Sequence, residues 1–204
     1  MPNYAIKLIR MTPLMLCSIG VFISNTLMAA ACNDVTVSAP LPGQFLRSYY
    51  AAFKSPTRLA IDAQDNVYIT DPLNHRIVVR APSGQIISQL TDLGYPISLA
   101  VNSLNSIYVG EGNLGRVDIY DVNGDSVGFL GIGDGEFSLP SHIAVLEVSG
   151  NVYVYVVDSD ADEVRRYDGV TGVFQLSFGG FGSANGKFVF PSGLAINKDR
   201  KSVV

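Results

Sequence analysis

The chain has 204 residues, of which 48% are hydrophobic and 16% are charged, with a formal net charge of −4. This hydrophobic content supplies a packed core and excludes an intrinsically disordered chain. The acidic balance disfavours nucleic acid as a partner, because a nucleic-acid surface needs a dense cluster of Lys and Arg to neutralise phosphates.

The first 31 residues have the layout of an export signal. Lys7 and Arg10 form a short positive region, residues 11–23 are apolar and uncharged, and residues 29–31 are all Ala. Small residues at these last positions fit a signal-peptidase cleavage site. We predict a signal peptide over residues 1–31 and a periplasmic, extracellular or envelope-anchored location. A transmembrane anchor is the alternative, but the apolar run is shorter than the roughly 20 residues that span a bilayer.

Cys32 directly follows the predicted signal and is the one cysteine left after its removal, so it forms no internal disulfide. Residues 27–32 (LMAAAC) resemble a bacterial lipobox, in which the cysteine is acylated, although Ala29 stands where Leu is commonest. Two alternatives stay open, namely lipidation at Cys32, which would give contact with a membrane, and cleavage to a soluble secreted form. Residues 32–42 are predicted to be a linker.

A repeated pattern, Pro-x-x-(Leu/Ile)-Ala-(Ile/Val), fills the rest of the chain. It begins at Pro56, Pro96, Pro140 and Pro191, so its copies are spaced by 40, 44 and 51 residues. Each copy continues with short segments rich in Val, Ile, Tyr and Phe, separated by polar or glycine turns. This is typical of a four-stranded antiparallel meander, and such a meander repeated about every 40 residues is the signature of a propeller blade.

Finer features of the repeats are also expected. Residues 131–137 and 182–188 share the linker pattern Gly-x-x-x-Gly-(Glu/Lys)-Phe and should lead from the outer edge of one blade to the inside of the next. Residues 151–154 (NVYV) align with residues 66–69 (NVYI) in the second strand. An insertion is expected in the turn at residues 160–162 of the third repeat.

The segment from Val67 to Ile77 reads Val-Tyr-Ile-x-Asp-x-x-Asn-x-Arg-Ile, and together with the preceding Pro-x-x-Leu-Ala-Ile it resembles an NHL repeat. The resemblance covers residues 43–204 and is weaker in the later copies, since Glu111 replaces the usual Asp and the third copy keeps only Asp158. It implies an all-β, six-bladed propeller in which an N-terminal strand, here residues 43–53, completes the last blade.

The repeats amount to about three full blades with a partial first and last blade. Three interpretations of this incomplete ring stay open. The chain is a truncated gene product or fragment, two copies close a ring by self-association, or the arc persists with a partner. An open arc would expose strand edges and apolar faces, which proteins normally avoid.

Few side chains suggest chemistry. Asp71, Asn74 and Arg76 are expected to brace a turn through hydrogen bonds. The acidic run of residues 158–163 is interpreted as a solvated turn, with calcium as the alternative. His75 and His142 are not expected to meet, so a zinc site, which needs three or four converging ligands, is disfavoured. We therefore predict no cofactor.

The best candidates for ligand binding are Arg58, Ser98 and His142, which hold equivalent positions before successive inner strands and would ring one mouth of the central channel. Their presence favours a binding scaffold for a protein, peptide or glycan. The resemblance supplies the alternative, a fragment of a metal-dependent propeller enzyme similar to peptide-amidating lyases or sugar lactonases. The catalytic residues of such an enzyme cannot be assembled from this sequence.

Overall fold

The computed structural model describes residues 5–11, 43–50, 52–196 and 202–203, and these fall into two compact units. The smaller unit contains β1 (Ala5–Met11), paired antiparallel with β2 (Gly43–Tyr50). The strand expected over residues 43–53 is therefore present, but its partner is β1, which lies within the segment that the sequence predicts to be a signal peptide. The rest of the predicted signal peptide, the linker and Cys32 lie outside the described residues.

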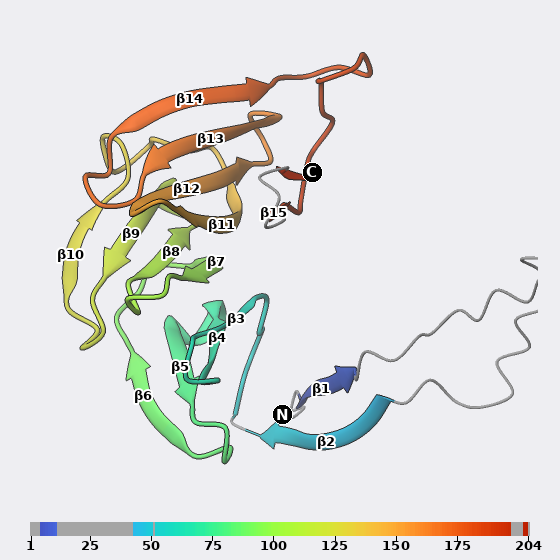
Figure 1. Ribbon diagram of the computed structural model, residues 1–204, viewed down its shortest axis with the longest axis vertical. Helices are drawn as coiled ribbons and strands as arrows, with labels where there is room; N and C mark the ends of the chain where they lie inside the picture. The colour runs from blue at the N-terminus through green and yellow to red at the C-terminus, as the bar shows by residue number, and fades with distance from the viewer. Residues whose placement is uncertain (1–4, 12–42, 51, 197–201, 204) are drawn as a thin grey trace, which may run out of the picture. The chain divides into compact units, whose positions relative to one another are not determined.

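The larger unit is all-β, as predicted, with three four-stranded antiparallel sheets in which strands adjacent in sequence are adjacent in space (Figure 1). We call these sheets blades 1, 2 and 3. Their strands are β3 (Leu59–Ile61), β4 (Val67–Asp71), β5 (Arg76–Arg80), β6 (Ile86–Leu90), β7 (Pro96–Val101), β8 (Ile107–Glu111), β9 (Arg116–Tyr120), β10 (Ser126–Phe129), β11 (Pro140–Val148), β12 (Asn151–Asp158), β13 (Glu163–Asp168) and β14 (Phe174–Gly179).

A fourth repeat begins with β15 (Ala195–Ile196), which pairs antiparallel with β16 (Ser202–Val203). The inner strands β3, β7 and β11 lie on one side of the arc in Figure 1, and the outer strands β6, β10 and β14 lie on the other. A 3-10 turn, η1 (Pro72–Asn74), is the one helical element among the described residues, and no helix there is long and apolar enough to cross a membrane.

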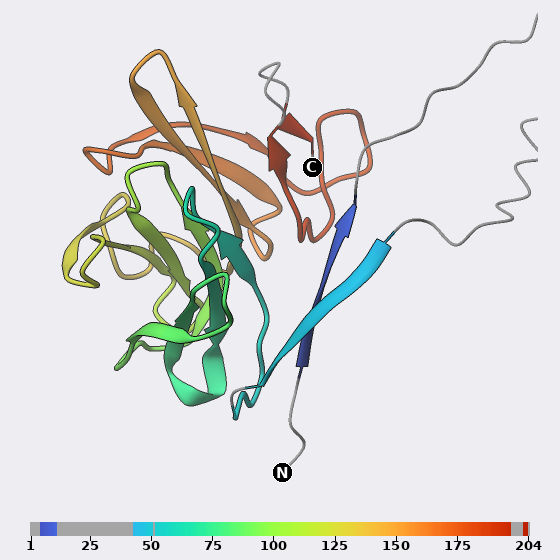
Figure 2. The same ribbon diagram turned by 60° about the horizontal axis from the view of Figure 1, so that its bottom comes forward.

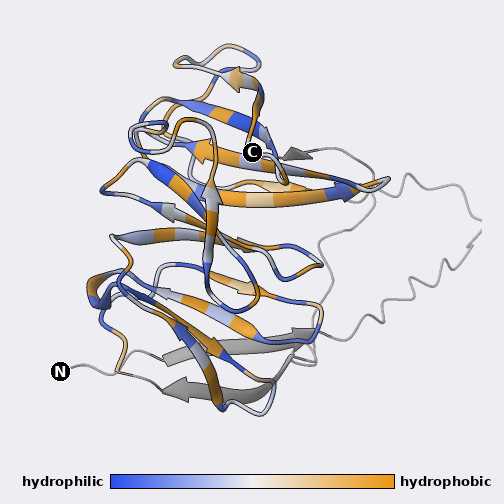
Figure 3. Ribbon diagram, turned by 90° about the vertical axis from the view of Figure 1, so that its left-hand side faces the viewer, coloured by the Kyte–Doolittle hydropathy of each residue, from blue (hydrophilic) through white to orange (hydrophobic). Residues whose placement is uncertain are grey.

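The middle strands explain why the blades stack. Every residue of β4 and of β8 is buried, whereas most of β6 and β14 is exposed. A strand rich in Val, Ile and Tyr can be buried on both faces only when another sheet covers each face. Figure 3 shows the sheets as successive layers, with hydrophobic residues along their strands.

Two hydrophobic clusters fill the spaces between blades, which we call seams. The seam between blades 1 and 2 contains Tyr68, Ile77, Val79, Leu90, Leu93, Leu99, Ile107 and Val109. The seam between blades 2 and 3 contains Ala100, Tyr108, Val117, Ile119, Leu130, Phe137, Ile143, Val154, Val156 and Tyr167. No blade buries its apolar faces alone, so each depends on its neighbour.

The third blade corrects the sequence alignment. Tyr68 pairs with Ala60, Tyr108 with Ala100, and Tyr155 with Ala144, so Tyr155 and not Tyr153 is the counterpart of the earlier tyrosines. The prediction of an insertion at residues 160–162 is wrong, because that turn has the same length as residues 73–75 of blade 1. The extra residues lengthen the hairpin of β11 and β12, which is prominent in Figure 2.

Candidate functional site

The three residues predicted to line a channel mouth lie at the start of the inner strands, two positions after a proline. Arg58 comes directly before β3, Ser98 lies in β7, and His142 lies in β11. The structure gives each of them a different environment, so the three positions are equivalent in the repeat but not in their availability to a ligand.

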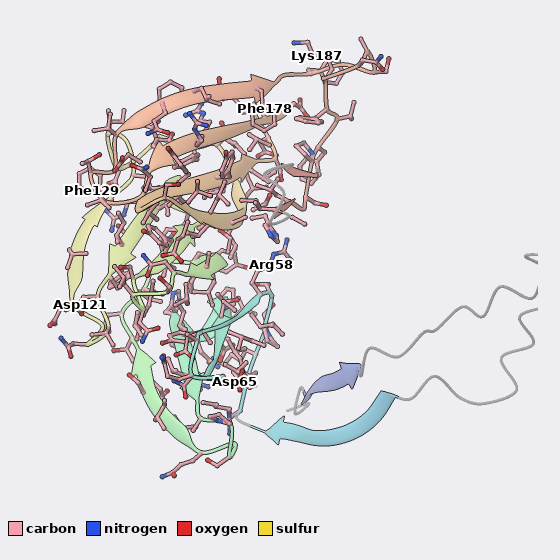
Figure 4. All side chains as sticks on the ribbon, in the orientation of Figure 1. Arg58, Asp65, Asp121, Phe129, Phe178 and Lys187 are labelled. Atoms are coloured by element: carbon pink, nitrogen blue, oxygen red, sulfur yellow. The ribbon has the colours of Figure 1, made fainter. Side chains whose placement is uncertain are left out.

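Arg58 reaches across from blade 1 to blade 3 and to the fourth repeat. Its Nη2 donates to the carbonyl oxygens of Ser141 and Ser192, each at 3.2 Å, and its Nη1 donates to the carbonyl oxygen of Thr57 at 3.3 Å. Its Nε is buried and has no hydrogen-bond partner. Figure 4 shows Arg58 on the inner side of the arc. One guanidinium thus ties three repeats together and retains an unused N–H.

His142 is half-buried and belongs to the same end of the inner strands. Burial lowers the pKa of His142, and the positive charge of Arg58 lowers it further, while a hydrogen bond to the backbone of Leu194 partly opposes the shift. The imidazole is therefore neutral at pH 7. Arg58 and His142 are predicted to share a rim, and the hydrogen bond from Arg58 Nη2 to the carbonyl oxygen of Ser141, the residue before His142, brings Arg58 to this part of β11.

Ser98 differs, because it is completely buried and its Oγ donates to the carbonyl oxygen of Pro140 at 2.5 Å. This bond links blade 2 to blade 3. The hydroxyl proton of Ser98 is therefore committed within the protein, and the ligand-binding role expected for it does not suit its environment. The sequence of one repeat does not show that neighbouring inner strands approach closely enough to bury Ser98.

Asp71, Asn74 and Arg76 form the turn brace that the sequence predicted. The Asp71 carboxylate accepts hydrogen bonds from Asn74 Nδ2 at 2.6 Å and from Arg76 Nε at 3.1 Å. It also accepts the backbone N–H groups of Lys54 and Ser55, at 2.9 and 3.3 Å. Burial raises the pKa of Asp71, but these hydrogen bonds outweigh burial and lower it below its usual value.

The same position holds an acid in each of the three blades, and each carboxylate binds the linker that precedes its own inner strand. Asp158 accepts the backbone N–H groups of Ser138 and Leu139, at 2.9 and 2.8 Å. Glu111 accepts the N–H of Tyr95 at 2.5 Å. We call these three acids, Asp71, Glu111 and Asp158, the linker latches. They were not predicted as a set, although their common position in the repeat was a usable signal.

The acidic turn of blade 3 is less solvated than expected, since Asp158 is completely buried and holds the linker. Asp162 Oδ1 accepts the N–H of Phe190, and Glu163 pairs with Arg165 at 2.7 Å. Among the described residues, no group of three or more His, Cys, Asp or Glu side chains is placed to hold a metal ion. His75 lies in the turn between β4 and β5, and its Nδ1 contacts the Gly94 carbonyl oxygen at 2.5 Å.

Comparison with known proteins supports the fold. No protein-family model and no curated protein matches the sequence. The chain is similar to hydrazine synthase from Kuenenia stuttgartiensis, with a TM-score of 0.60 and 16% identity over 74% of this chain and 41% of that chain. It is similar to a streptogramin B lyase, with a TM-score of 0.60 and 14% identity over 78% of this chain and 51% of that chain.

A third similar structure is a catalytically inactive virginiamycin B lyase from Staphylococcus aureus with quinupristin, with a TM-score of 0.53 and 14% identity over 66% of this chain and 45% of that chain. The chain thus spans about half the length, or less, of these solved structures. The neighbours are β-propeller proteins and establish the propeller architecture of the blades. At these identities they establish the fold alone, so the NHL resemblance stays a prediction.

Proposed function

We propose that the chain is a propeller-type binding module that acts outside the cytoplasm and holds a carboxylate of its ligand at the end of the inner strands where Arg58 and His142 lie. The observation that carries the proposal is the hydrogen bond from Arg58 Nη2 in blade 1 to the carbonyl oxygen of Ser141 in blade 3, the residue before His142. The proposed ligand is a protein, peptide or glycan that presents the carboxylate.

The chemistry of the two side chains suits an anion. A guanidinium is always charged near neutral pH, and a charge-assisted hydrogen bond from it to a carboxylate is stronger than a bond between neutral groups. The Nε of Arg58 is the N–H left over after its backbone contacts. Because the pKa of His142 is lowered, this side chain gains a positive charge only below its ordinary value of 6.5. Binding of an anion is therefore expected to tighten as the pH falls from 7 to 5.

Paired ligands provide the test. Isothermal titration calorimetry would compare a peptide that ends in a free carboxylate with its amidated twin, and a uronate-containing oligosaccharide with its neutral counterpart. We expect the carboxylate-bearing member of at least one pair to bind more tightly and Arg58→Gln to remove the preference. Lys187→Gln is the matched control. Lys187 is exposed, lies in the linker that follows β14, and donates to the Gly179 carbonyl oxygen.

Equal binding of both members of each pair, or a preference that survives Arg58→Gln, would contradict the proposed site. The tightening of carboxylate binding between pH 7 and pH 5 should disappear in His142→Gln. A pH dependence that persists in this variant would assign the effect to another group.

A second candidate, a fragment of a propeller enzyme, is favoured by the likeness to two lyases. An activity screen with lactones, streptogramins and peptide substrates, with and without added divalent metal ions, separates the candidates. Turnover that requires metal would support the enzyme, whereas tight binding of a carboxylate ligand without turnover would support the module.

The location is part of the proposal and is tested separately. Cell fractionation should find the chain in the envelope or the medium, with residues 1–31 removed. Metabolic labelling with a fatty acid distinguishes the two forms, because label that disappears in Cys32→Ala indicates a lipid anchor. Retention of the chain in the cytoplasm would contradict export.

A further inference from the structure

The seam between blades 1 and 2 contains a cavity of about 250 Å³ that the function proposed above does not use. Its walls include the apolar side chains of Val79, Leu90 and Ile107. Its polar lining includes Asp62, Tyr68 and Asn105. Since one water occupies about 30 Å³ in the liquid, the cavity is large enough for a small organic molecule.

Asp62 places a negative charge at the cavity in a fixed position. The residue is only 7% exposed. Oδ1 accepts the backbone N–H groups of Gln64 and Asn66, and Oδ2 accepts Asn66 Nδ2 at 2.8 Å and the Tyr68 hydroxyl at 3.2 Å. These four bonds use the lone pairs of the carboxylate, so its charge acts on a ligand through space. A buried charge is little screened by salt.

Two oxygens remain for direct contact with a ligand. Asn105 Nδ2 donates to Gln64 Oε1 at 3.1 Å, whereas the buried Asn105 Oδ1 has no partner. Burial, with the Asp62 charge as the second cause, raises the pKa of Tyr68 to about 12. The hydroxyl therefore stays neutral, donates to Asp62 and keeps a free lone pair. Buried acceptors are normally satisfied, so the site lacks a hydrogen-bond donor.

The electrostatic surroundings favour a cation. None of the described residues that line the cavity is Lys, Arg or His. The two turns that border it, residues 62–66 and 121–125, add Asp65, Asp121 and Asp125 to Asp62. Asp65 and Asp121 are labelled in Figure 4, in blades 1 and 2. An anionic or purely acceptor ligand would be repelled here, and a donor with a positive charge would be attracted.

The equivalent region of the next seam is bridged by hydrogen bonds of the protein. There Tyr108, the counterpart of Tyr68, donates its hydroxyl proton across the seam to the Gly169 carbonyl oxygen at 2.9 Å. Ser103 Oγ also crosses this seam, donating to Glu147 Oε1 at 2.8 Å. The tyrosine of this position thus bridges the second seam, whereas in the first seam Tyr68 bonds to Asp62 of its own blade beside the cavity.

We propose that the cavity between blades 1 and 2 binds a small primary ammonium ion on a short aliphatic stem. The ammonium group donates to Asn105 Oδ1 and to the Tyr68 hydroxyl oxygen beside the charge of Asp62. The stem packs on Val79 and Ile107. A free alkylamine and the side chain of a lysine both present this chemistry.

The test uses the full chain and amide NMR titrations at pH 7. The probes are n-butylamine, which is cationic at this pH, n-butanol as its uncharged counterpart of equal size, and N-acetyl-lysine methylamide as the lysine form. We expect saturable shifts at residues 62–66 and 105 with n-butylamine, with a Kd of about 10 mM or tighter for so small a ligand. We expect binding by n-butanol to be at least about tenfold weaker. Saturable binding of the lysine probe would identify a polypeptide as the source, and binding of n-butylamine alone would identify a free amine.

Asp62→Asn removes the negative charge. The variant copies a residue that the protein already uses, because Asn102 holds the equivalent position in blade 2. Asn102 Oδ1 accepts the N–H groups of Leu104 and Ser106 and so forms the same turn. We expect Asp62→Asn to weaken n-butylamine binding by about tenfold, and Asn102→Asp, which adds a carboxylate at the closed seam, to leave it unchanged. Ser88→Trp should block the cavity and abolish binding.

Three results would overturn the proposal, namely absence of saturable binding by both amines, equal binding of n-butylamine and n-butanol, or wild-type affinity in Asp62→Asn. The comparison of n-butylamine with n-butanol on the wild-type chain tests the proposal even where a variant fails to fold. Loss of carboxylate binding at Arg58 would leave this site untouched, because it lies in a different part of the repeat.

Discussion

The two seams of this protein are built from the same repeat but closed by different means. The seam between blades 2 and 3 is bridged by Ser98, Ser103 and Tyr108, whose hydroxyl groups reach Pro140, Glu147 and Gly169. In the seam between blades 1 and 2, the Tyr68 hydroxyl instead turns back to Asp62 of its own blade. The Tyr68 hydroxyl therefore does not bridge the first seam, where the cavity lies.

One atom explains much of the difference. Asp62 only accepts hydrogen bonds, so the nearby tyrosine gives it its single hydroxyl proton. Asn102 in blade 2 can donate, and a hydrogen bond from Asn102 to Tyr108 leaves the Tyr108 proton free to cross the seam. The facing position differs as well, since Gly169 in blade 3 corresponds to Val122 in blade 2. A change from acid to amide and from valine to glycine thus separates a closed seam from an open one.

The largest loss of stability is expected at Gly169, where the seam between blades 2 and 3 has no room for a side chain. A Cβ at Gly169 would lie 2.5 Å from Val152 Cγ1 and 3.0 Å from the Tyr108 hydroxyl oxygen. Gly169→Val should therefore lower the free energy of unfolding by about 2–4 kcal/mol, through overpacking and loss of the seam hydrogen bond. Urea denaturation followed by circular dichroism measures this change.

Val122→Gly is the control at the open seam. Val122 is 63% exposed, so the substitution should cost no more than about 1 kcal/mol, mainly from backbone entropy. Equal losses in the two variants would show that the seams do not differ in packing.

Removal of the two tyrosine hydroxyls should give a smaller difference in stability, again with the larger loss at the seam between blades 2 and 3. Tyr108→Phe removes the donor of a buried bond and leaves the Gly169 carbonyl oxygen unpaired, so we expect a loss of about 1–2 kcal/mol. Tyr68→Phe leaves Asp62 with its three other donors and should cost below about 1 kcal/mol. Thermal and urea denaturation of the pair provide the measurement, and a larger loss in Tyr68→Phe would contradict the comparison.

Much of this architecture could be predicted from the repeat, because Pro56, Pro96 and Pro140 each mark the entry to an inner strand. The insertion was misplaced for a physical reason. Tyr153 and Tyr155 are two residues apart and share a strand face, so the alternating pattern fits either register equally well. The reach of Arg58, the burial of Ser98 and the open cavity depend on how neighbouring sheets approach, and one repeat read alone does not contain that information.

The linker latches extend the contrast and give the smallest predicted effect. Asp158, beside the closed seam, uses both carboxylate oxygens to hold Ser138 and Leu139. Glu111, beside the open seam, is equally buried, but its Oε1 has no partner. Burial raises the pKa of Glu111, and the nearby charge of Asp118 adds to the rise, while the bond from Tyr95 opposes it. The ionised form of Glu111 is therefore disfavoured in the folded state.

The direction of the pH dependence follows from that raised pKa. Below the unfolded value of 4.5, Glu111 is protonated in both states and imposes no penalty. As the pH rises from 4.5 to the higher folded pKa, the unfolded state loses the Glu111 proton and the folded state keeps it, so the wild-type chain loses stability relative to Glu111→Gln until both states are ionised. The glutamine keeps one acceptor for the Tyr95 N–H. We expect urea denaturation to show Glu111→Gln equal to the wild type near pH 4 and more stable by up to about 1 kcal/mol at pH 7. Asp158→Asn should instead be destabilised at pH 7, because an amide offers one acceptor oxygen to two N–H groups. If Glu111→Gln were the less stable variant at pH 7, the free oxygen of Glu111 would have a partner that holds its charge, and the two latches would be alike.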